Sequence, residues 1–414
     1  MPGYIPRRLS TVALSLADTF PVVTVTGPRQ SGKTTLVRRI FPDHGYINLE
    51  QPDIRLFAEQ DPRAFFKRYA PPVIIDEIQR VPALLSYIQA MVDEEPSCRG
   101  RFILTGSQQP DLRAAVSQSL AGRTALLRLL PLSIAELCDA GTRMERDEYI
   151  YKGFMPRLYN NDLSPSVMYS QYYQTYVERD VRQVANIRNI IAFETFIRLL
   201  AGRVGQVVNI SDLSNSTGTS ASTLSEWLGI LEASFIVFRL PPWFDNFGKR
   251  LIKSPKVYFT EPGLAAWLLG ITEPAHVGTG PYLGGLFENM VVVEALKARL
   301  NGGLDSNLYF FRDNNGLETD LLLNEGTDLI PVEIKASMTF SSDFVKSLPR
   351  LRKASDRILA GYVVYAGDLE FEFKGSRIVN FANTETIIQD PRGPQHSDHP
   401  AKPVRTFPQG GDER

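Results

Sequence analysis

The sequence predicts an α/β protein whose first third is built around a parallel sheet. Apolar runs at residues 20–26, 71–75 and 101–104 each end in glycine or polar residues, and segments of helical pattern lie between them. Buried parallel strands read as continuous apolar runs because helices cover both faces of their sheet. The residues that follow such strands gather at one edge of the sheet, where α/β proteins bind their ligands.

Composition and charge favour a cytoplasmic protein of two or three domains. The chain has 414 residues, of which 43% are hydrophobic and 22% charged, enough for sizeable cores. Its formal net charge of -1 gives no global indication of nucleic acid or membrane as a partner. Cys98 and Cys138 indicate a reducing compartment, and the four histidines are too scattered for a zinc site. The sequence shows no secretory segment and no apolar run approaching ~18 residues, so no membrane association is expected.

A phosphate-binding loop is predicted at residues 27–34, Gly-Pro-Arg-Gln-Ser-Gly-Lys-Thr. The pattern G-x-x-x-x-G-K-[ST] is specific when a strand precedes it and a helix follows, as here. The glycines let the backbone fold tightly, so that successive N–H groups converge on a phosphate. Lys33 offers a positive charge to the β- and γ-phosphates of ATP, and the Thr34 hydroxyl is a hard oxygen ligand for Mg²⁺. The residues expected to bind the nucleotide are Gly27, Arg29, Gln30, Ser31, Gly32, Lys33, Thr34 and Thr35.

The segments around this loop follow the expected alternation. A short helix at residues 9–16 leads into the first strand, and Arg7 and Arg8 precede it. Either arginine could lie near the nucleotide, but a solvated start of the chain is the favoured interpretation. Residues 45–49 predict a strand, and residues 53–69 predict one helix from the spacing of their apolar positions.

A second nucleotide-site element is predicted where the run at 71–75 ends in Asp76 and Glu77. Side chains at the carboxyl end of a buried parallel strand point into the crevice beside the phosphates. Asp76 can hold Mg²⁺ through water, and Glu77 can take a proton from the attacking water. The alternative is a capping pair that opens the helix expected at residues 83–92.

Further residues are predicted to act on the γ-phosphate. The strand at 101–108 ends in small polar residues, of which Thr105 or Ser107 could hydrogen-bond the γ-phosphate or the lytic water; the alternative is ordinary turn chemistry. Arg123 is a candidate for stabilising γ-phosphate charge, from its own or a neighbouring subunit. A surface ion pair is the alternative for Arg123.

Four motifs in this order resemble one known family. They are Gly-Pro-Arg-Gln-Ser-Gly-Lys-Thr-Thr, Ile-Ile-Asp-Glu-Ile-Gln-Arg-Val-Pro, Ile-Leu-Thr-Gly-Ser and Ser-Leu-Ala-Gly-Arg. The chain resembles prokaryotic AAA-type ATPases joined to a C-terminal domain of unknown function, DUF4143. The resemblance continues at residues 176–181, 253–259 and 286–289 and covers about residues 1–385. It implies an ATPase core and a ring or other homo-oligomer.

The middle of the chain predicts a winged-helix-like domain. Helices are expected at residues 193–203, 211–217 and 223–233, and a strand at 235–240. The third helix of such a domain often enters the major groove of DNA. Here that helix carries no Lys or Arg, although phosphate contacts usually come from those residues. Packing against the ATPase core is therefore its alternative role, with a local basic surface formed by Lys249, Arg250, Lys253 and Lys256.

The C-terminal part predicts strands flanked by helices. On the strand at residues 330–335, Glu333 and Lys335 share one face, and Asp320 on the neighbouring strand could meet Glu333 across the sheet. Two carboxylates suit Mg²⁺, and a lysine can polarise a phosphate or activate water. With Glu288 on the preceding helix, this pattern resembles the PD-(D/E)xK nuclease core, although it lacks the proline that commonly precedes the aspartate. The alternative is a Glu–Lys pair on a solvated strand face.

These predictions combine into one expected organisation. We expect a P-loop ATPase core at 1–145, the winged-helix-like segment at 146–270, a restriction-endonuclease-like α/β module at 271–389, and a disordered tail at 390–414. The expected function is Mg²⁺-dependent ATP hydrolysis applied to DNA through the C-terminal half. The alternatives are a nucleotide-gated switch or scaffold that binds a protein partner, and an ATP-regulated nuclease.

Overall fold

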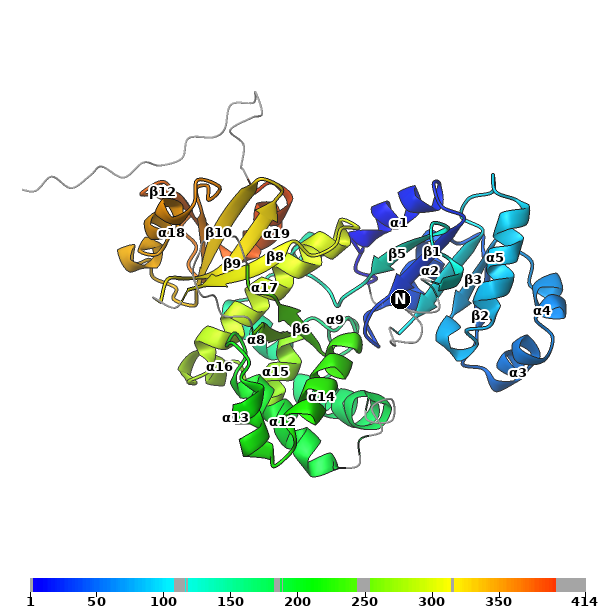
Figure 1. Ribbon diagram of the computed structural model, residues 1–414, viewed down its shortest axis with the longest axis horizontal. Helices are drawn as coiled ribbons and strands as arrows, with labels where there is room; N and C mark the ends of the chain where they lie inside the picture. Colours follow the sequence, from blue (N-terminus) through cyan, green and yellow to red (C-terminus); the bar gives the residue numbers. More distant parts are fainter. Residues whose placement is uncertain are drawn as a thin grey trace, which may run out of the picture.

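The computed structural model describes residues 3–107, 116, 118–181, 187, 189–243, 254–313 and 316–391 (Figure 1). A parallel sheet near the N-terminus lies at one side of the molecule and a mixed sheet near the C-terminus at the other. The helices of the middle segment lie beneath and between them in this view. Lys249, Arg250, Lys253 and the predicted tail from residue 392 onward lie outside the described residues.

The N-terminal sheet confirms the predicted parallel α/β core. Its strands are β1 (Val22–Thr26), β2 (Gly45–Asn48), β3 (Val73–Asp76), β4 (Phe102–Gly106) and β5 (Thr124–Arg128). They run parallel in the order β2-β3-β4-β1-β5, and Val22 of β1 is level with Phe102 and Thr124. The carboxyl ends of β1, β3 and β4 therefore meet at one edge, which brings the segments after Thr26, Asp76 and Gly106 together.

Helices cover both faces of this sheet, as continuous apolar strands require. They are α1 (Leu9–Ala17), α2 (Lys33–Ile40), α3 (Pro52–Gln60), α4 (Pro62–Arg68) and α5 (Leu84–Glu94). One core packs α1 and α2 against Val23 and Val25, and a second core packs α3 to α5 against Val22 on the other face. The alternation along β1 is the period of two that a strand imposes.

The single helix expected at residues 53–69 is two helices. Helix α3 ends at Gln60, and Asp61 then caps α4 by accepting a hydrogen bond from the backbone N–H of Ala64 at 2.9 Å. Pro62 occupies the first position of α4, where its missing N–H costs nothing. The apolar spacing continues across this junction, so periodicity alone did not reveal the break.

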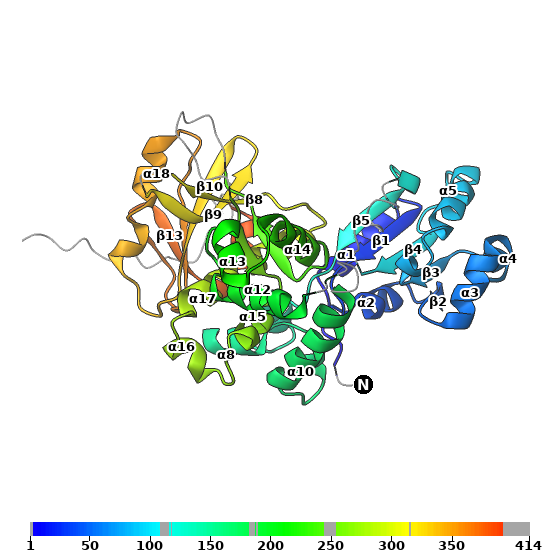
Figure 2. The ribbon, with the colours of Figure 1, turned by 60° about the horizontal axis from the view of Figure 1, so that its bottom comes forward.

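The middle segment is mainly helical, as Figure 2 shows. It contains α7 (Ile134–Asp139), α8 (Arg146–Lys152), α9 (Arg157–Asn160), α10 (Pro165–Tyr172), a π-helical stretch (Tyr173–Val181), α12 (Ile190–Gly202), α13 (Ile210–Thr217), α14 (Ala221–Ala233), β6 (Val237–Leu240), β7 (Lys256–Phe259), α15 (Pro262–Leu268) and α16 (Ala275–Thr279). Helices α12 to α14 lie near the three predicted helices, and they are followed by the antiparallel pair β6–β7. Trp227 of α14 packs edge-on against Phe193 of α12.

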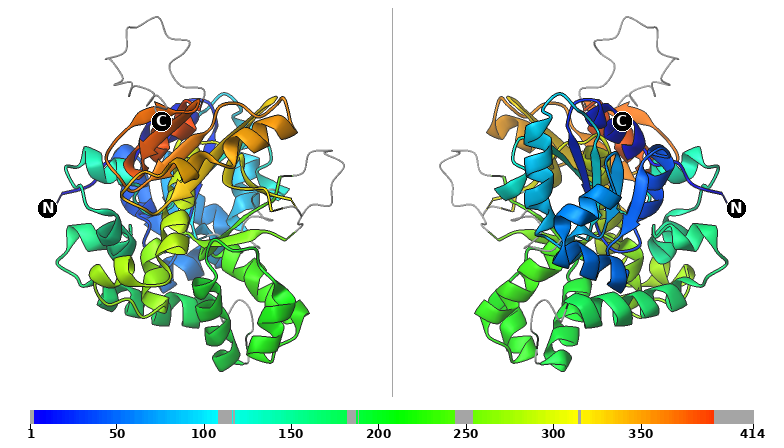
Figure 3. Two further views of the ribbon diagram at one scale, coloured as in Figure 1. Left: turned by 90° about the vertical axis from the view of Figure 1, so that its left-hand side faces the viewer. Right: turned by 90° about the vertical axis from the view of Figure 1, so that its right-hand side faces the viewer.

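The C-terminal part is a mixed α/β unit. It contains α17 (Leu283–Asn301), β8 (Leu308–Arg312), β9 (Glu318–Glu325), β10 (Asp328–Lys335), α18 (Leu348–Ala354), β11 (Tyr362–Tyr365), β12 (Phe371–Phe373), β13 (Ser376–Asn380) and α19 (Thr384–Gln389). Its strand order is β12-β13-β11-β10-β9-β8, with β8, β9 and β10 antiparallel and β10 and β11 parallel. In the left view of Figure 3, α17 runs from this sheet toward the middle segment.

The middle and C-terminal parts share one hydrophobic core. The buried residues of this core lie between Leu130, just beyond the ATPase sheet, and Ile388 in α19, and a separate smaller core of the C-terminal part contains Phe311, Leu348 and Val363. Helix α17 is buried along most of its length, and its Phe287 packs edge-on against Phe381. None of the helices in the described part of the chain is long and apolar enough to cross a membrane.

Candidate functional site

The predicted phosphate-binding loop joins β1 to α2, as its sequence pattern requires. Gly27 has a φ of 153°, and a Cβ there would overlap the carbonyl oxygen of Leu129. Gly32 precedes α2 in a left-handed conformation, with a φ of 93°. Residues that carry a Cβ rarely adopt such backbone conformations. Both glycines therefore let the loop turn tightly into the N-terminus of α2, whose N–H groups and dipole favour an anion.

Lys33, the first residue of α2, is buried beneath this loop. Its Nζ donates hydrogen bonds to the carbonyl oxygens of Gly27, at 3.0 Å, and Pro28, at 2.8 Å. Burial lowers the pKa of Lys33 to about 8, although Glu77 and Asp76 act in the opposite direction. The ammonium group is held by neutral carbonyls, so a phosphate could take their place and keep the lysine charged.

Asp76, at the end of β3, is the centre of a hydroxyl cluster. Its Oδ2 accepts hydrogen bonds from the hydroxyls of Thr34, at 2.9 Å, and Tyr46, at 2.8 Å. Its Oδ1 accepts one from Thr105, which lies near the end of the adjacent strand β4. Thr34 and Asp76 are neighbouring hard oxygen donors, which fits one Mg²⁺ whose coordination the phosphates would complete. Tyr46 was missed from the sequence, since nothing in the motif of β3 indicates its partner on β2.

Glu77 projects into the space in front of the loop from an unusual backbone conformation. Its φ of 58° is left-handed, which is uncommon outside glycine and concentrates at functional sites. Gln79 donates a hydrogen bond to the Glu77 carboxylate and another to the Ser107 hydroxyl at 2.9 Å. Burial raises the pKa of Glu77. The capping alternative does not hold, because the Glu77 side chain caps no helix and Ala83 is the residue before α5.

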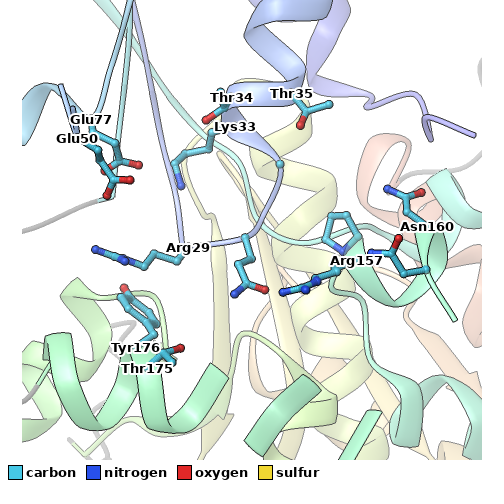
Figure 4. A pocket seen from close by; sticks show the side chains of 14 residues that line it. Arg29, Lys33, Thr34, Thr35, Glu50, Glu77, Arg157, Asn160, Thr175 and Tyr176 are labelled. Carbon is cyan, nitrogen blue, oxygen red and sulfur yellow. The ribbon is translucent and has the colours of Figure 1, made fainter. Parts of the chain in front are cut away.

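A cavity of about 570 Å³ opens in front of the loop and is walled by two parts of the chain. Figure 4 shows Glu50 and Glu77 toward one end and Arg157 and Asn160 toward the other. The lining residues of the ATPase core are Arg29, Gln30, Gly32, Lys33, Thr34, Thr35, Glu50 and Glu77, and those of the middle segment are Pro156, Arg157, Asn160, Asn161, Thr175 and Tyr176. The guanidinium of Arg29 lies 5.6 Å from the ring centre of Tyr176. The middle-segment residues that line the cavity were not predicted from the sequence, because no motif identifies them.

Arg7 lies behind the loop rather than in solvent, so the expected solvated start is wrong for this residue. Its guanidinium donates to the carbonyl of Ser31 at 2.7 Å and pairs with Glu136 at 3.0 Å. Both side chains are buried. Arg8 is more exposed and pairs with Asp139 and Glu385, each at 3.0 Å. A buried arginine needs this many acceptors, and they come from segments far away in the sequence.

Arg123 does not reach the phosphate site of its own chain. It precedes β5, and its carbonyl accepts a hydrogen bond from the N–H of Val22, the first residue of β1. That position is the edge of the sheet opposite the loop. The guanidinium pairs with Asp93 at 2.6 and 2.8 Å on the surface. The surface ion pair, which was the alternative interpretation, is what the structure contains.

The predicted C-terminal cluster does assemble, but its carboxylates are already paired. Lys335 Nζ lies 3.1 Å from Asp320 Oδ2 and 2.7 Å from Glu333 Oε2. Glu333 is buried, so the solvated-face alternative does not describe it. Glu288 contacts Lys256 at 3.0 Å, which places Lys256 in the interior and not on the expected basic surface. Within the described ranges, no group of three or more His, Cys, Asp or Glu side chains is arranged to hold a metal ion.

Family models match most of the chain in three consecutive segments. An AAA domain matches residues 19–138, a domain of unknown function (DUF8612) matches residues 143–275, and a second domain of unknown function (DUF4143) matches residues 283–384. The first covers the parallel sheet and the loop, the second most of the middle segment, and the third the mixed sheet with α17.

The solved structures found to be similar to this chain are distant from it in sequence. A Walker-type ATPase of Pyrococcus abyssi is 14% identical, covering 64% of this chain and 96% of that one, with a TM-score of 0.40. DnaA from Aquifex aeolicus, bound to AMPPCP, is 12% identical, covering 54% of this chain and 85% of that one, with a TM-score of 0.29.

Curated relatives are closer. A Mycobacterium tuberculosis protein described as uncharacterized is 31% identical over 328 residues, which is 77% of this chain and 71% of the relative. An uncharacterized Haemophilus influenzae protein is 24% identical over 384 residues, covering 84% of this chain and 90% of that one. Together with the family models, these relatives show that the chain belongs to the AAA-type P-loop ATPases that carry a C-terminal DUF4143 domain.

Proposed function

We propose that this protein is a Mg²⁺-dependent ATP hydrolase in which nucleotide occupancy sets the contact between the ATPase core and the middle segment. The observation that carries the proposal is the composition of the cavity in front of the loop. Core residues such as Lys33 and Glu77 line it together with Arg157 and Tyr176 of the middle segment. A nucleotide bound there would touch both parts, so binding and hydrolysis would change the free energy of their contact.

The hydrolytic step is assigned to residues that meet at the edge of the parallel sheet. Lys33 would leave its two carbonyl acceptors to bind the phosphates, and Thr34 with Asp76 would hold the metal. Mg²⁺, when bound, would neutralise phosphate charge as the bond to the γ-phosphate breaks. Glu77 would accept the proton of the attacking water, and its raised pKa makes it a stronger base than an exposed carboxylate.

Other residues of the site position these groups. Gln79 bridges Glu77 and Ser107, which fixes the direction of the proposed base. Thr105 holds Asp76 in place and, in this structure, uses its hydroxyl for that contact rather than for a water in the cavity. We assign Arg157 to the phosphate chain, because it supplies a positive charge from the middle segment to the cavity that the loop lines.

A buried polar path links the loop to the C-terminal part. Arg7 bonds the loop carbonyl of Ser31 and pairs with Glu136 of α7. At the start of α7, the N–H of Ile134 donates to Glu294 of α17 at 2.7 Å. Lys297 of α17 then donates to the carbonyl of Leu132 at 2.7 Å. A change in the loop on ATP hydrolysis could therefore reach α17 through direct contacts.

The work done by this coupling is proposed to be an action on DNA. The element order of α12, α13, α14, β6 and β7 supports this output, because winged helices commonly bind DNA. Helix α14 has no Lys or Arg, and Lys256 is buried in an ion pair. Direct reading of the groove by α14 is therefore not part of the proposal, and the phosphate contacts are assigned to the basic residues at 249–253.

A second candidate output is a nucleotide-gated switch that binds a protein partner. The same absence of positive charge from α14 favours it, since a neutral helix face suits a protein surface better than a phosphate backbone.

The family type also supports a homo-oligomer. Arg123, on the outer edge of the core, could act only on the site of a second copy.

The deciding experiment measures the ATPase rate of the wild type and Glu77→Gln with linear, single-stranded and branched DNA. Stimulation of the wild type by one DNA form, absent in the variant, is the expected result for action on DNA. A basal rate that depends on Glu77 but not on DNA would support the switch, which should capture its partner only with ATP and shift no DNA at low salt. A wild-type rate equal to that of Glu77→Gln would overturn the hydrolase itself.

A further inference from the structure

Lys256 belongs to the middle segment, but its ammonium group lies among carboxylates of the C-terminal part, namely those of Glu288 and Glu318. It is the first residue of β7, and its side chain is 3% exposed. Its Nζ lies 3.0 Å from Glu288 Oε1 of α17 and 2.9 Å from Glu318 Oε1 of β9. The ring of Phe310 lies 5.5 Å from the same ammonium group and adds a further favourable contact.

The carboxylate of Glu288 is enclosed by the middle segment. The hydroxyl of Tyr258, also on β7, donates a hydrogen bond to Glu288 Oε1 at 2.6 Å. On another side runs the backbone of Gly205, which has a φ of 77° and where an added Cβ would lie 3.2 Å from the carboxylate. A side chain at this position would therefore be strained and would crowd Glu288. Lys256, Tyr258 and Gly205 together leave little room around Glu288 for a hydrated ion.

The remaining carboxylates have partners within the C-terminal module. Asp320 Oδ2 accepts from the backbone N–H of Ile334 at 2.8 Å and from Lys335 at 3.1 Å. Glu333 accepts from Lys335 at 2.7 Å and from the Ser347 hydroxyl at 2.6 Å. A divalent ion would have to replace these donors, because Mg²⁺ requires oxygen ligands in near-octahedral geometry. The donor set as it stands does not fit a metal.

We propose that the Lys256 ammonium occupies the cation position of this cluster, so that the cluster is a socket for β7 rather than a divalent-metal site. The socket joins the middle segment to the C-terminal module through the buried ammonium of Lys256 and the partly buried carboxylates of Glu288 and Glu318. Burial alone lowers the pKa of Lys256, but the surrounding carboxylates Glu288, Asp320 and Glu318 raise it above the ordinary value, so the cation stays charged. The inference does not depend on the proposed ATPase activity.

The test measures how much Mn²⁺ the nucleotide-free full chain binds. The electron paramagnetic resonance signal of the free ion reports the Mn²⁺ that remains unbound. We expect no Mn²⁺ site in the wild type that depends on Asp320, and about one gained equivalent in Lys256→Met, because removal of the ammonium leaves carboxylate oxygens facing each other. Lys256→Arg is the matched control that keeps the charge and should gain nothing. Lys256→Met combined with Asp320→Asn should lose the gained equivalent, which locates it in the cluster.

Two results would overturn the socket. One is Mn²⁺ binding by the wild type that disappears in Asp320→Asn. The other is a folded Lys256→Met variant that gains no Mn²⁺ site. Lys256→Met leaves the partly buried Glu288 without its cation, so folding is tested separately in Lys256→Met with Glu288→Gln. This neutral pair should melt at a higher temperature than Lys256→Met alone, and an equal or lower melting temperature would contradict the ion pair.

Discussion

The loop site and the C-terminal cluster both place a lysine near two carboxylates. Only the lysine of the loop site has no carboxylate bonded to its ammonium group and can therefore bind a phosphate. Lys33 is held by the carbonyls of Gly27 and Pro28, and a cavity opens in front of it. Lys256 and Lys335 are held by carboxylates within 3.1 Å. Replacing a carbonyl by a phosphate is favourable, whereas pulling a lysine from a buried carboxylate leaves an unpaired charge.

The difference shows that residue types do not distinguish a reactive site from a structural one. Burial lowers the pKa of Lys33, because neutral carbonyls compensate its charge only in part. Carboxylates outweigh burial at Lys335 and raise its pKa. A lysine that lacks a counter-ion is ready to accept one from a ligand. A lysine that already has one stabilises the fold instead.

The largest expected effect separates the two sites by activity. Glu77→Gln should lower the ATPase rate by about 10²–10⁴-fold, the range typical of a lost general base, while leaving ATP binding intact. Asp320→Asn, which makes the same change of charge in the C-terminal cluster, should leave the rate unchanged. Steady-state hydrolysis and nucleotide binding of both variants would check this. A large loss of rate in Asp320→Asn would mean that the cluster takes part in ATP turnover.

The second effect separates the sites by stability. Lys256→Met should lower the free energy of unfolding by about 3–5 kcal/mol, because it leaves the mostly enclosed carboxylate of Glu288 without its cation. Lys346→Met is the control, since Lys346 forms an exposed pair with Asp343 and such pairs contribute little. Urea unfolding followed by circular dichroism measures both. Equal losses would contradict the assignment of Lys256 as a structural cation.

The third effect concerns pH. Because the pKa of Lys33 lies at about 8 before nucleotide binds, the ammonium form is fully present below that pH and is lost above it. Bound phosphate requires the charged form, so the dissociation constant for ATP should rise about tenfold per pH unit above the pKa. Titrations between about pH 7 and pH 10 would show the slope. Lys33→Arg cannot lose its proton in this range, so its binding should show no such slope.

The smallest effect concerns the wall of the cavity. Arg157→Ala should weaken ATP binding about tenfold, the loss expected when one charge-assisted contact to phosphate disappears. Arg123→Ala is the matched control and should not change binding in dilute protein, because Arg123 lies at the opposite edge of the sheet. Isothermal titration with ATP would compare them. Unchanged binding in Arg157→Ala would remove the middle segment from the nucleotide site.

The sequence alone determined the parts of the molecule that depend on near neighbours in the chain. The loop at 27–34 is encoded by consecutive residues, and Asp76 and Glu77 follow a strand whose apolar run identifies it. The period of two placed Glu333 and Lys335 on one face of β10, and the structure brings Asp320 of β9 to them through Lys335. Such features follow from local backbone geometry, which a motif records directly.

Only the tertiary structure decided which of these groups are already neutralised. The ion pairs of Arg7 with Glu136 and of Lys256 with Glu288 join residues that are far apart in the chain, and so does the cavity that the loop and Arg157 both line. No periodicity connects these residues. The same holds for Arg123, whose motif is one of the four that carry the family resemblance but lies at the edge of the sheet opposite the loop. Charge compensation depends on distances in space, and distances of this kind are fixed only when the sheets and helices pack.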